Sequence, residues 1–388
     1  MAAKAIPIGA GVPQAETRAK KCKPSLDPNR RSVEAEQLEK SLLRRVVGQA
    51  EAIEAVIEMY EIFLSDLNPP GRPISNMLFL GPTGTGKTHV VEAVAETLFG
   101  TPDAVIKIDC GEYQHEHDIA KLVGSPPGYV GHGATPPLLC QERLNQWHTE
   151  KNKISLLLFD EIEKAHEALW QLLLGILDKA TITLGDNRRV DFTRCMVFMT
   201  SNLGATEMAT LVSGGLGFAS NQRTSEDEIE QKITRVAIEA ARHRFSPEFI
   251  NRLDRIVVFR RLRREQLERI VDLELEAVRR LIDRTAKPFW FCCTPEAKHF
   301  LLDHGTDPRY GARPLKRVIE HYVIFPLANL VASGQIEKGD TVVIDVSGSN
   351  LNFVVACMCE ACRCGDSASC GRGIRESSGD VSECPQSM

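Results

Sequence analysis

The chain has 388 residues and a formal net charge of −5, and 43% of its residues are hydrophobic. This length allows two or three domains. The acidic balance gives no general attraction for nucleic acid, and no stretch approaches the roughly 18 consecutive apolar residues of a membrane-spanning helix. Because the amino terminus also has no apolar leader segment, we expect a cytoplasmic protein that binds neither nucleic acid nor a membrane.

The first part of the chain is predicted to be an arm followed by two helices. Residues 1–33 mix Pro, Gly, Ala and Lys without a period, which predicts disorder. Apolar residues then recur at helical spacing over 34–65, with a break near Val46, Val47 and Gly48. The prolines of SDLNPPGRP end the second helix.

Short apolar runs that are rich in β-branched and aromatic residues come next. They cover 76–81, 104–110, 155–161, 195–201 and 255–259, and helical stretches such as KTHVVEAVAETLF separate them. Strands that are apolar throughout and alternate with helices are typical of a parallel sheet with helices on both faces. We therefore expect a large α/β domain over 34–259.

Beyond Arg260 the alternation stops. Three amphipathic helical stretches and the segment DTVVIDVSGSNLNFVVA predict a smaller, mostly helical domain with a closing hairpin over 260–350. Residues 351–388 form a cysteine-rich tail that is expected to be disordered. Four of its cysteines are close enough in sequence to bind one soft metal as thiolates, although a tail of reduced thiols is the alternative: Cys357, Cys359, Cys362 and Cys364.

A glycine-rich segment between the first apolar run and the following helix matches the phosphate-binding P-loop pattern. It consists of Gly81, Pro82, Thr83, Gly84, Thr85, Gly86, Lys87 and Thr88. Backbone N–H groups at the start of the helix favour phosphate oxygens. Lys87 is expected to reach those oxygens and Thr88 to bind Mg²⁺, which makes ATP and Mg²⁺ the predicted cofactors.

Polar side chains end two later apolar runs. Asp160 and Glu161 close LLLFDE, and we expect Asp160 to bind Mg²⁺ and Glu161 to activate the attacking water. The alternative is a solvated strand end before a charged helix start. Thr200 and Asn202 close MTSN, where they could hold the water or the γ-phosphate, or cap a helix.

Five motifs together give the sequence a family likeness. GPTGTGKT, LLLFDEIEKAH, TSNLGA, FSPEFINRLD and YGARPLKR occur in the order and spacing of the Clp-type AAA+ ATPases, and they resemble the second ATPase ring of those proteins. The resemblance runs from about Val46 to Val346. It implies an AAA+ P-loop fold followed by a helical lid, and a homo-oligomeric, hexameric ring.

The resemblance also implies roles for individual residues. Asn202 matches sensor 1, Arg252 matches the arginine finger that reaches the ATP of a neighbouring subunit, and Arg313 matches sensor 2. Val46 and Val47 match the segment that packs on adenine. For Arg252 the alternative is a salt bridge with Asp254 or Glu248, since such neighbours are common on surfaces.

The segment GSPPGYVGHG lies where Clp relatives carry an axial pore loop. Its tip, Gly128, Tyr129, Val130 and Gly131, is predicted to grip a threaded protein substrate by apolar contact. A tyrosine covered by its own loop and a proline-rich ligand for an aromatic groove are the alternatives. Residues 183–192, which include Arg188 and Arg189, are a second candidate channel loop or else a solvated hairpin tip.

One more loop is similar to the segment by which some Clp ATPases dock a barrel peptidase. Leu216, Gly217 and Phe218 would supply the apolar anchor, and a plain glycine-rich loop with one buried phenylalanine is the alternative. No adaptor domain, first ATPase ring or middle coiled coil precedes residue 46, which favours a compact single-ring machine over a disaggregase.

The resemblance thus implies an ATP-dependent protein unfoldase or remodelling chaperone, with a peptidase as a candidate partner. A nucleotide-gated assembly scaffold and a nucleic-acid-associated motor or loader are the rival functions.

Overall fold

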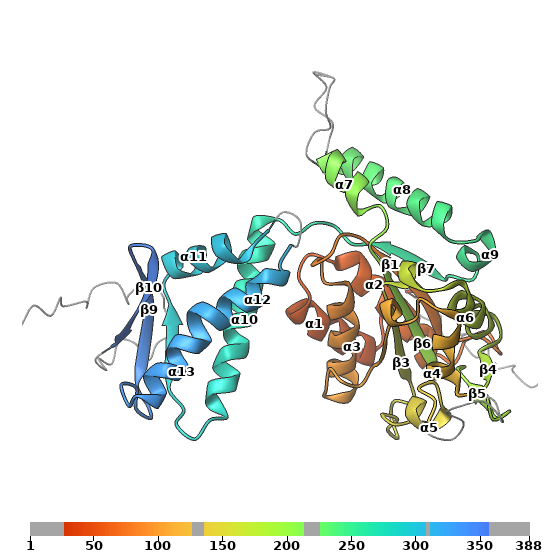
Figure 1. The fold of residues 1–388 in the computed structure, drawn as a ribbon, viewed down its shortest axis with the longest axis horizontal. Coiled ribbons are helices and arrows are strands. Elements are labelled where there is room, and N and C mark those ends of the chain that lie inside the picture. Colours follow the sequence, from red (N-terminus) through yellow and green to blue (C-terminus); the bar gives the residue numbers. More distant parts are fainter. Residues whose placement is uncertain (1–26, 126–135, 213–225, 308–310, 357–388) are drawn as a thin grey trace, which may run out of the picture.

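The computed structural model describes residues 27–125, 136–212, 226–307 and 311–356. The pore-loop tip, the candidate docking tripeptide and the four tail cysteines all lie outside these ranges. Figure 1 shows two bodies, one built around a parallel sheet and a smaller one of helices with a short sheet. Within the described residues, no helix is both long and apolar enough to cross a membrane.

The first two helices form where the apolar spacing predicted them. α1 (Val33–Arg45) begins at Ser32, whose hydroxyl accepts a hydrogen bond from the backbone N–H of Ala35. α2 (Ala50–Leu64) follows after the break at Gly48, which has a positive φ of 77°. Side chains of both helices pack against the sheet.

All five apolar runs form strands of one parallel sheet. The strands are β1 (Ser75–Leu80), β2 (Ile106–Asp109), β3 (Ser155–Asp160), β6 (Cys195–Ser201) and β7 (Arg255–Val258). Their order is β2-β3-β6-β1-β7, so β3, β6 and β1 lie side by side at the centre. Every residue of β1 and β6 is buried, as the continuous apolar runs predicted.

Helices cover both faces of this sheet, which confirms the predicted α/β class (Figure 1). Met77 and Phe79 point toward α1, α2 and α3 (Lys87–Phe99), while Leu78 and Leu80 point to the other face. On that other face lie α6 (Glu167–Lys179), α8 (Glu226–Arg244) and α9 (Pro247–Ile250). The alternation of successive side chains along β1 therefore builds two separate hydrophobic cores.

Short elements connect these parts. They are η1 (Cys110–Glu112), η2 (Glu116–Ile119), α4 (Ala120–Val123), α5 (Gln141–Leu144), η3 (Ile162–Lys164), α7 (Ala205–Val212) and the hairpin of β4 (Thr181–Thr183) with β5 (Arg189–Asp191). The second candidate channel loop is this hairpin. Its exposed Arg188 pairs with Asp186 at 2.7 Å and Glu142 at 3.2 Å, as expected of a solvated tip.

The smaller body contains the predicted helices and hairpin. Its elements are α10 (Arg264–Asp283), β8 (Trp290–Cys293), α11 (Pro295–Gly305), α12 (Arg313–Ile319), η4 (Glu320–Ile324), α13 (Phe325–Ala332), β9 (Thr341–Ser347) and β10 (Asn350–Val355). β9 and β10 form the expected antiparallel hairpin. The predicted start of the disordered tail at residue 351 was wrong, because residues 351–355 pair with β9 as part of β10. The structure adds β8, which pairs in parallel with β9 and which the sequence analysis did not identify.

The third predicted helix of this body runs on as α12, η4 and α13, and η4 is a π-helical turn. Pro326 follows this turn and has no N–H to donate to the preceding turn. The wider turn keeps the chain helical next to this residue. π-helical turns are rare, and they occur mostly as single turns inside α-helices.

Candidate active site

The P-loop leaves the carboxyl end of β1 and enters α3. Gly81 has φ 149°, and a Cβ atom at this position would lie 2.5 Å from the carbonyl oxygen of Phe259. Gly86, with φ 96°, is the N-cap residue directly before α3. Only glycine meets the steric demand at Gly81 without displacing backbone, so the loop is held close to the end of β7.

Lys87 is buried and makes three hydrogen bonds. Its Nζ donates to the carbonyl oxygens of Gly81 at 2.7 Å and Pro82 at 2.9 Å, and to Asn202 Oδ1 at 2.9 Å. Burial lowers the pKa of Lys87 to about 8, although the nearby carboxylates of Glu163, Asp160 and Glu161 act in the opposite direction. The net effect is a pKa below the ordinary value of a lysine.

We expect ATP binding to weaken as the pH rises above this pKa of about 8. Phosphate oxygens favour the charged amine, so above that pH binding must be accompanied by proton uptake at Lys87. Calorimetric titrations in two buffers of different ionisation enthalpy measure that uptake. The Lys87→Met variant should lack it, and equal uptake by the variant and the wild type would show that another group titrates.

The predicted Mg²⁺ ligands lie next to each other. Thr88 Oγ1 lies 3.2 Å from Asp160 Oδ1, and Asp160 also accepts a hydrogen bond from Thr200 at 2.5 Å. Lys107 approaches the same carboxylate at 3.6 Å. A hydroxyl and a carboxylate oxygen are hard donors of the kind that Mg²⁺ prefers, so these residues fit the ion.

Glu161 follows Asp160 in an uncommon backbone conformation. Its φ is +56°, in the left-handed region, and its backbone N–H donates to Thr200 Oγ1 at 2.9 Å. Its side chain accepts a hydrogen bond from Asn202 Nδ2 at 3.0 Å and forms an ion pair with Lys164. A left-handed conformation at a residue other than glycine costs energy, so it persists only where the surrounding structure enforces it. Such conformations cluster at active sites.

Asn202 connects the P-loop to the carboxylates. Its Oδ1 accepts from Lys87 and, at 3.3 Å, from Thr83, while its Nδ2 donates to Glu161. Its backbone N–H donates to Glu163 Oε1 at 3.0 Å. One amide therefore contacts a residue proposed to hold phosphate and the residue proposed to activate water.

Two residues of this site were not singled out from the sequence. Glu163 holds the backbone of Asn202, and its Oε2 is buried with no hydrogen-bond partner among the described residues. Gln49 is buried, and its Nε2 donates to the carbonyl oxygens of Thr85 and Arg260, each at 3.1 Å. The only sequence signals were a third acid after LLLFDE and a glutamine after the Val-Val-Gly break.

The remaining candidates come from parts of the chain that are distant in sequence from the P-loop. Val46 and Val47 are buried just before Gln49. Arg313 is the first residue of α12 and is exposed, and the N–H of the preceding Ala312 donates to the carbonyl of Gly84 at 3.4 Å. The smaller body thus contacts the phosphate-binding loop at the predicted sensor 2 position.

Arg252 lies elsewhere on the sheet. It pairs with Glu248 at 2.9 Å and Asp178 at 3.5 Å, and its carbonyl accepts from Asn76 Nδ2 at 3.2 Å. The alternative pair with Asp254 does not form, since Asp254 accepts from the Asn76 N–H at 2.8 Å and faces Arg72 at 3.7 Å. Asn76 is at the amino end of β1, and the P-loop follows the opposite end.

The P-loop lies at the carboxyl edge of a parallel sheet, a carboxylate pair ends the next strand but one, and an asparagine lies between them. This arrangement defines an AAA+ type of P-loop ATPase. Two family models match the chain, "AAA domain (Cdc48 subfamily)" over residues 72–256 and "C-terminal, D2-small domain, of ClpB protein" over residues 262–344. The chain belongs to the Clp-type AAA+ ATPases and corresponds to their second ATPase ring.

Similar proteins include the chaperone ClpB of Rhizobium meliloti strain 1021, which is 39% identical over 317 residues, 82% of this chain and 34% of that protein. The chloroplastic ClpB2 of Oryza sativa subsp. japonica is 40% identical over 309 residues, 79% of this chain and 30% of that protein. The chain thus spans about a third of the length of these curated relatives.

Solved structures of yeast Hsp104 are similar as well. The S. cerevisiae Hsp104–ADP complex matches with a TM-score of 0.68 and 35% identity, and the match covers 81% of this chain and 52% of that one. The extended S. cerevisiae Hsp104–casein complex matches with a TM-score of 0.69 and 32% identity, and covers 83% and 53%.

Proposed function

We propose that the protein hydrolyses ATP to unfold or remodel protein substrates, as a homo-oligomeric, hexameric ring. The observation that carries this proposal is the convergence of Lys87, Glu161 and Asn202 from three different segments into one hydrogen-bonded group. The solved complex of Hsp104 with casein supports a protein as the substrate class.

In the proposed reaction the P-loop N–H groups and Lys87 bind the phosphates, and Val46 and Val47 contact the adenine. Thr88 and Asp160 would hold Mg²⁺, which would supply neutralisation of the phosphate charge. Glu161 takes a proton from the attacking water, and Asn202 keeps the Glu161 carboxylate oriented. Arg252 of a neighbouring subunit and Arg313 of the same subunit stabilise the charge on the transferred phosphoryl group.

Tyr129 is proposed to convert this hydrolysis into movement of the substrate. Replacing Tyr129 with alanine should leave ATP hydrolysis close to the wild-type rate, because Tyr129 is not among the residues proposed to bind ATP or to activate water. Unfolding of a tagged fluorescent protein should fall strongly, since an alanine offers little apolar contact. Tyr129→Phe, which keeps the ring, is the matched control. Full unfolding by Tyr129→Ala would contradict the pore-grip proposal.

Three finer features remain proposals. Leu216, Gly217 and Phe218 are proposed to dock a barrel peptidase, which co-purification with the Glu161→Gln variant in ATP would test.

A soft metal is proposed to bind at Cys357, Cys359, Cys362 and Cys364. This proposal requires stoichiometric zinc or iron in elemental analysis of purified protein. The cytoplasm stays the proposed compartment, although one similar protein is chloroplastic.

A further inference from the structure

Helix α8 (Glu226–Arg244) contacts three functional parts of the molecule. Its 19 residues correspond to a length of about 28 Å, and it crosses one face of the sheet (Figure 1). One end lies at the segment that joins β7 to α10, its middle lies on the turn after Asn202, and its other end lies at the turn after Glu161.

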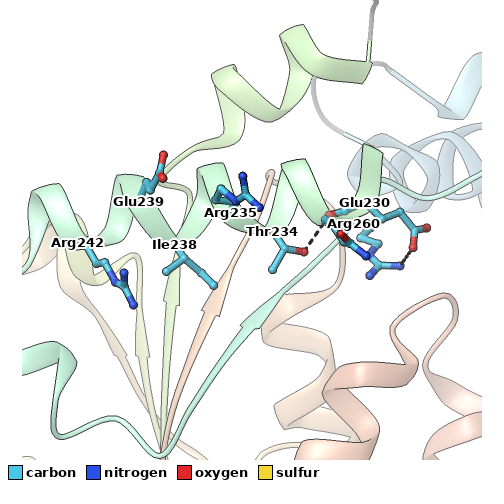
Figure 2. Close-up of a pocket in the computed structure, with 8 residues that line it drawn as sticks. Glu230, Thr234, Arg235, Ile238, Glu239, Arg242 and Arg260 are labelled. Atoms are coloured by element: carbon cyan, nitrogen blue, oxygen red, sulfur yellow. Dashed lines mark hydrogen bonds and ion pairs between the residues drawn. The ribbon is translucent and has the colours of Figure 1, made fainter. Parts of the chain in front are cut away.

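The amino-terminal end of α8 holds the segment between the two bodies. The Glu230 carboxylate pairs with Arg260 at 2.5 Å and with Arg263 at 3.6 Å, and Figure 2 shows Glu230 and Arg260 facing each other. The Gln49 side chain contacts the backbone of the same Arg260. Its Nε2 donates to the Arg260 carbonyl at 3.1 Å, and its Oε1 accepts from the Arg260 N–H at 3.4 Å. Residues 260–263, which we name the linker, are thus held by α8 and by a residue that also contacts the P-loop.

The middle of α8 packs directly on the turn that follows Asn202. Gly204 has φ +74°, and a Cβ atom there would lie 3.1 Å from Ala237 Cα and 3.5 Å from Ala240 Cβ. Ala237 and Ala241 are fully buried. Small residues on both sides bring the two backbones into contact, so little space remains for the turn to move without the helix.

The carboxyl-terminal end of α8 holds the turn that follows Glu161. Arg244 donates to the carbonyl of Glu163 at 3.0 Å, and its guanidinium lies 4.3 Å from the centre of the Trp170 ring. Trp170 in turn donates through Nε1 to the carbonyl of Ile162 at 3.1 Å. A planar guanidinium stacked on an indole is a well-oriented contact.

We propose that α8 is a positioning element that couples the two turns after Glu161 and Asn202 to the linker, with Glu230 as its positioning residue at the linker. A helix moves as a rigid rod, so a shift of either turn on ATP binding displaces Glu230 and with it Arg260 and Arg263. The inference rests on the proposed ATPase function. It adds a coupling within one subunit, from the turns next to the proposed γ-phosphate site to the smaller body, which is the predicted lid.

The test reverses the charge at this contact in the full chain. Glu230→Arg should repel Arg260 and Arg263, leave ATP affinity and basal hydrolysis near the wild-type values, and lower unfolding per ATP hydrolysed by about tenfold. The double variant Glu230→Arg with Arg260→Glu restores an opposite-charge pair and should recover most of the loss. Glu239→Arg makes the same charge change at an exposed position of the same helix and is the matched control.

A second measurement does not depend on turnover. Hydrogen exchange of the linker amides is expected to slow when ATP binds to Glu161→Gln protein, and this response should disappear when Glu230→Arg is added. An unchanged response in the presence of Glu230→Arg, or unchanged unfolding per ATP, would overturn the inference. A wild-type protein that releases no phosphate would instead refute the proposed function, while the exchange result would still decide the role of Glu230.

Discussion

Replacing Glu161 with glutamine is expected to leave ATP binding intact and to lower steady-state phosphate release by about 100-fold or more. The amide has nearly the same shape, and its oxygen can still accept the hydrogen bond from Asn202 Nδ2. It cannot accept a proton from water, and it loses the ion pair with Lys164. Binding of a fluorescent ATP analogue and phosphate release measure the two effects separately.

Glu163 supplies the matched control for that variant. It lies two residues further on, and its Oε1 accepts from the backbone N–H of Asn202. Glu163→Gln makes the same charge change while the amide oxygen can keep that hydrogen bond, so we expect a much smaller loss of hydrolysis. If Glu163→Gln were the more damaging change, Glu161 would not be the base.

The sheet and the phosphate-binding segment were predictable because their signals are local. The central strands β3 and β6 lie in nearly continuous apolar runs, and the P-loop pattern is contained in eight consecutive residues. Thr88 and Asp160 come together because the carboxyl ends of parallel strands meet at one edge of the sheet. Neither step needs any knowledge of how the two bodies pack.

The contacts of Gln49, Glu163 and Arg244 were not predictable in this way. Each depends on a backbone group that is distant in sequence, such as Arg260 for Gln49 and Asn202 for Glu163. A glutamine, a glutamate and an arginine are common on protein surfaces, so residue type alone carries no signal. β8 escaped prediction because it lies between two helical stretches, outside the strand–helix alternation, and its place in a sheet depends on pairing with β9.

Arg252 and the P-loop of the same subunit lie at opposite ends of β1. Its carbonyl is hydrogen-bonded to Asn76, near the amino end of β1, whereas Gly81 follows the carboxyl end. Five residues of extended strand separate these points by about 16 Å, which is more than an arginine side chain spans. Arg252 therefore cannot contact the γ-phosphate held by its own P-loop, and this geometry supports the proposed action on a neighbouring subunit.

Arg252→Ala is accordingly expected to lower ATP hydrolysis by about 1,000-fold and to leave ATP binding nearly unchanged. Its ion pairs with Glu248 and Asp178 are partly exposed, so their loss should cost little folding stability. Arg255→Ala is the matched control, because Arg255 is a nearby surface arginine that pairs with Glu58. Phosphate release, nucleotide binding and thermal unfolding are to be measured for both variants.

Mixing two inactive variants tests whether the arginine acts between subunits. Arg252→Ala subunits keep an intact P-loop, and Lys87→Ala subunits keep an intact arginine. In a mixed ring, the P-loop of some Arg252→Ala subunits faces the intact Arg252 of a Lys87→Ala subunit. Part of the hydrolysis should therefore return, although each variant alone is inactive. Subunit exchange, followed by energy transfer between labelled chains, verifies that mixed rings form. Mixed rings without any recovered hydrolysis would show that Arg252 does not complete the site of a neighbour.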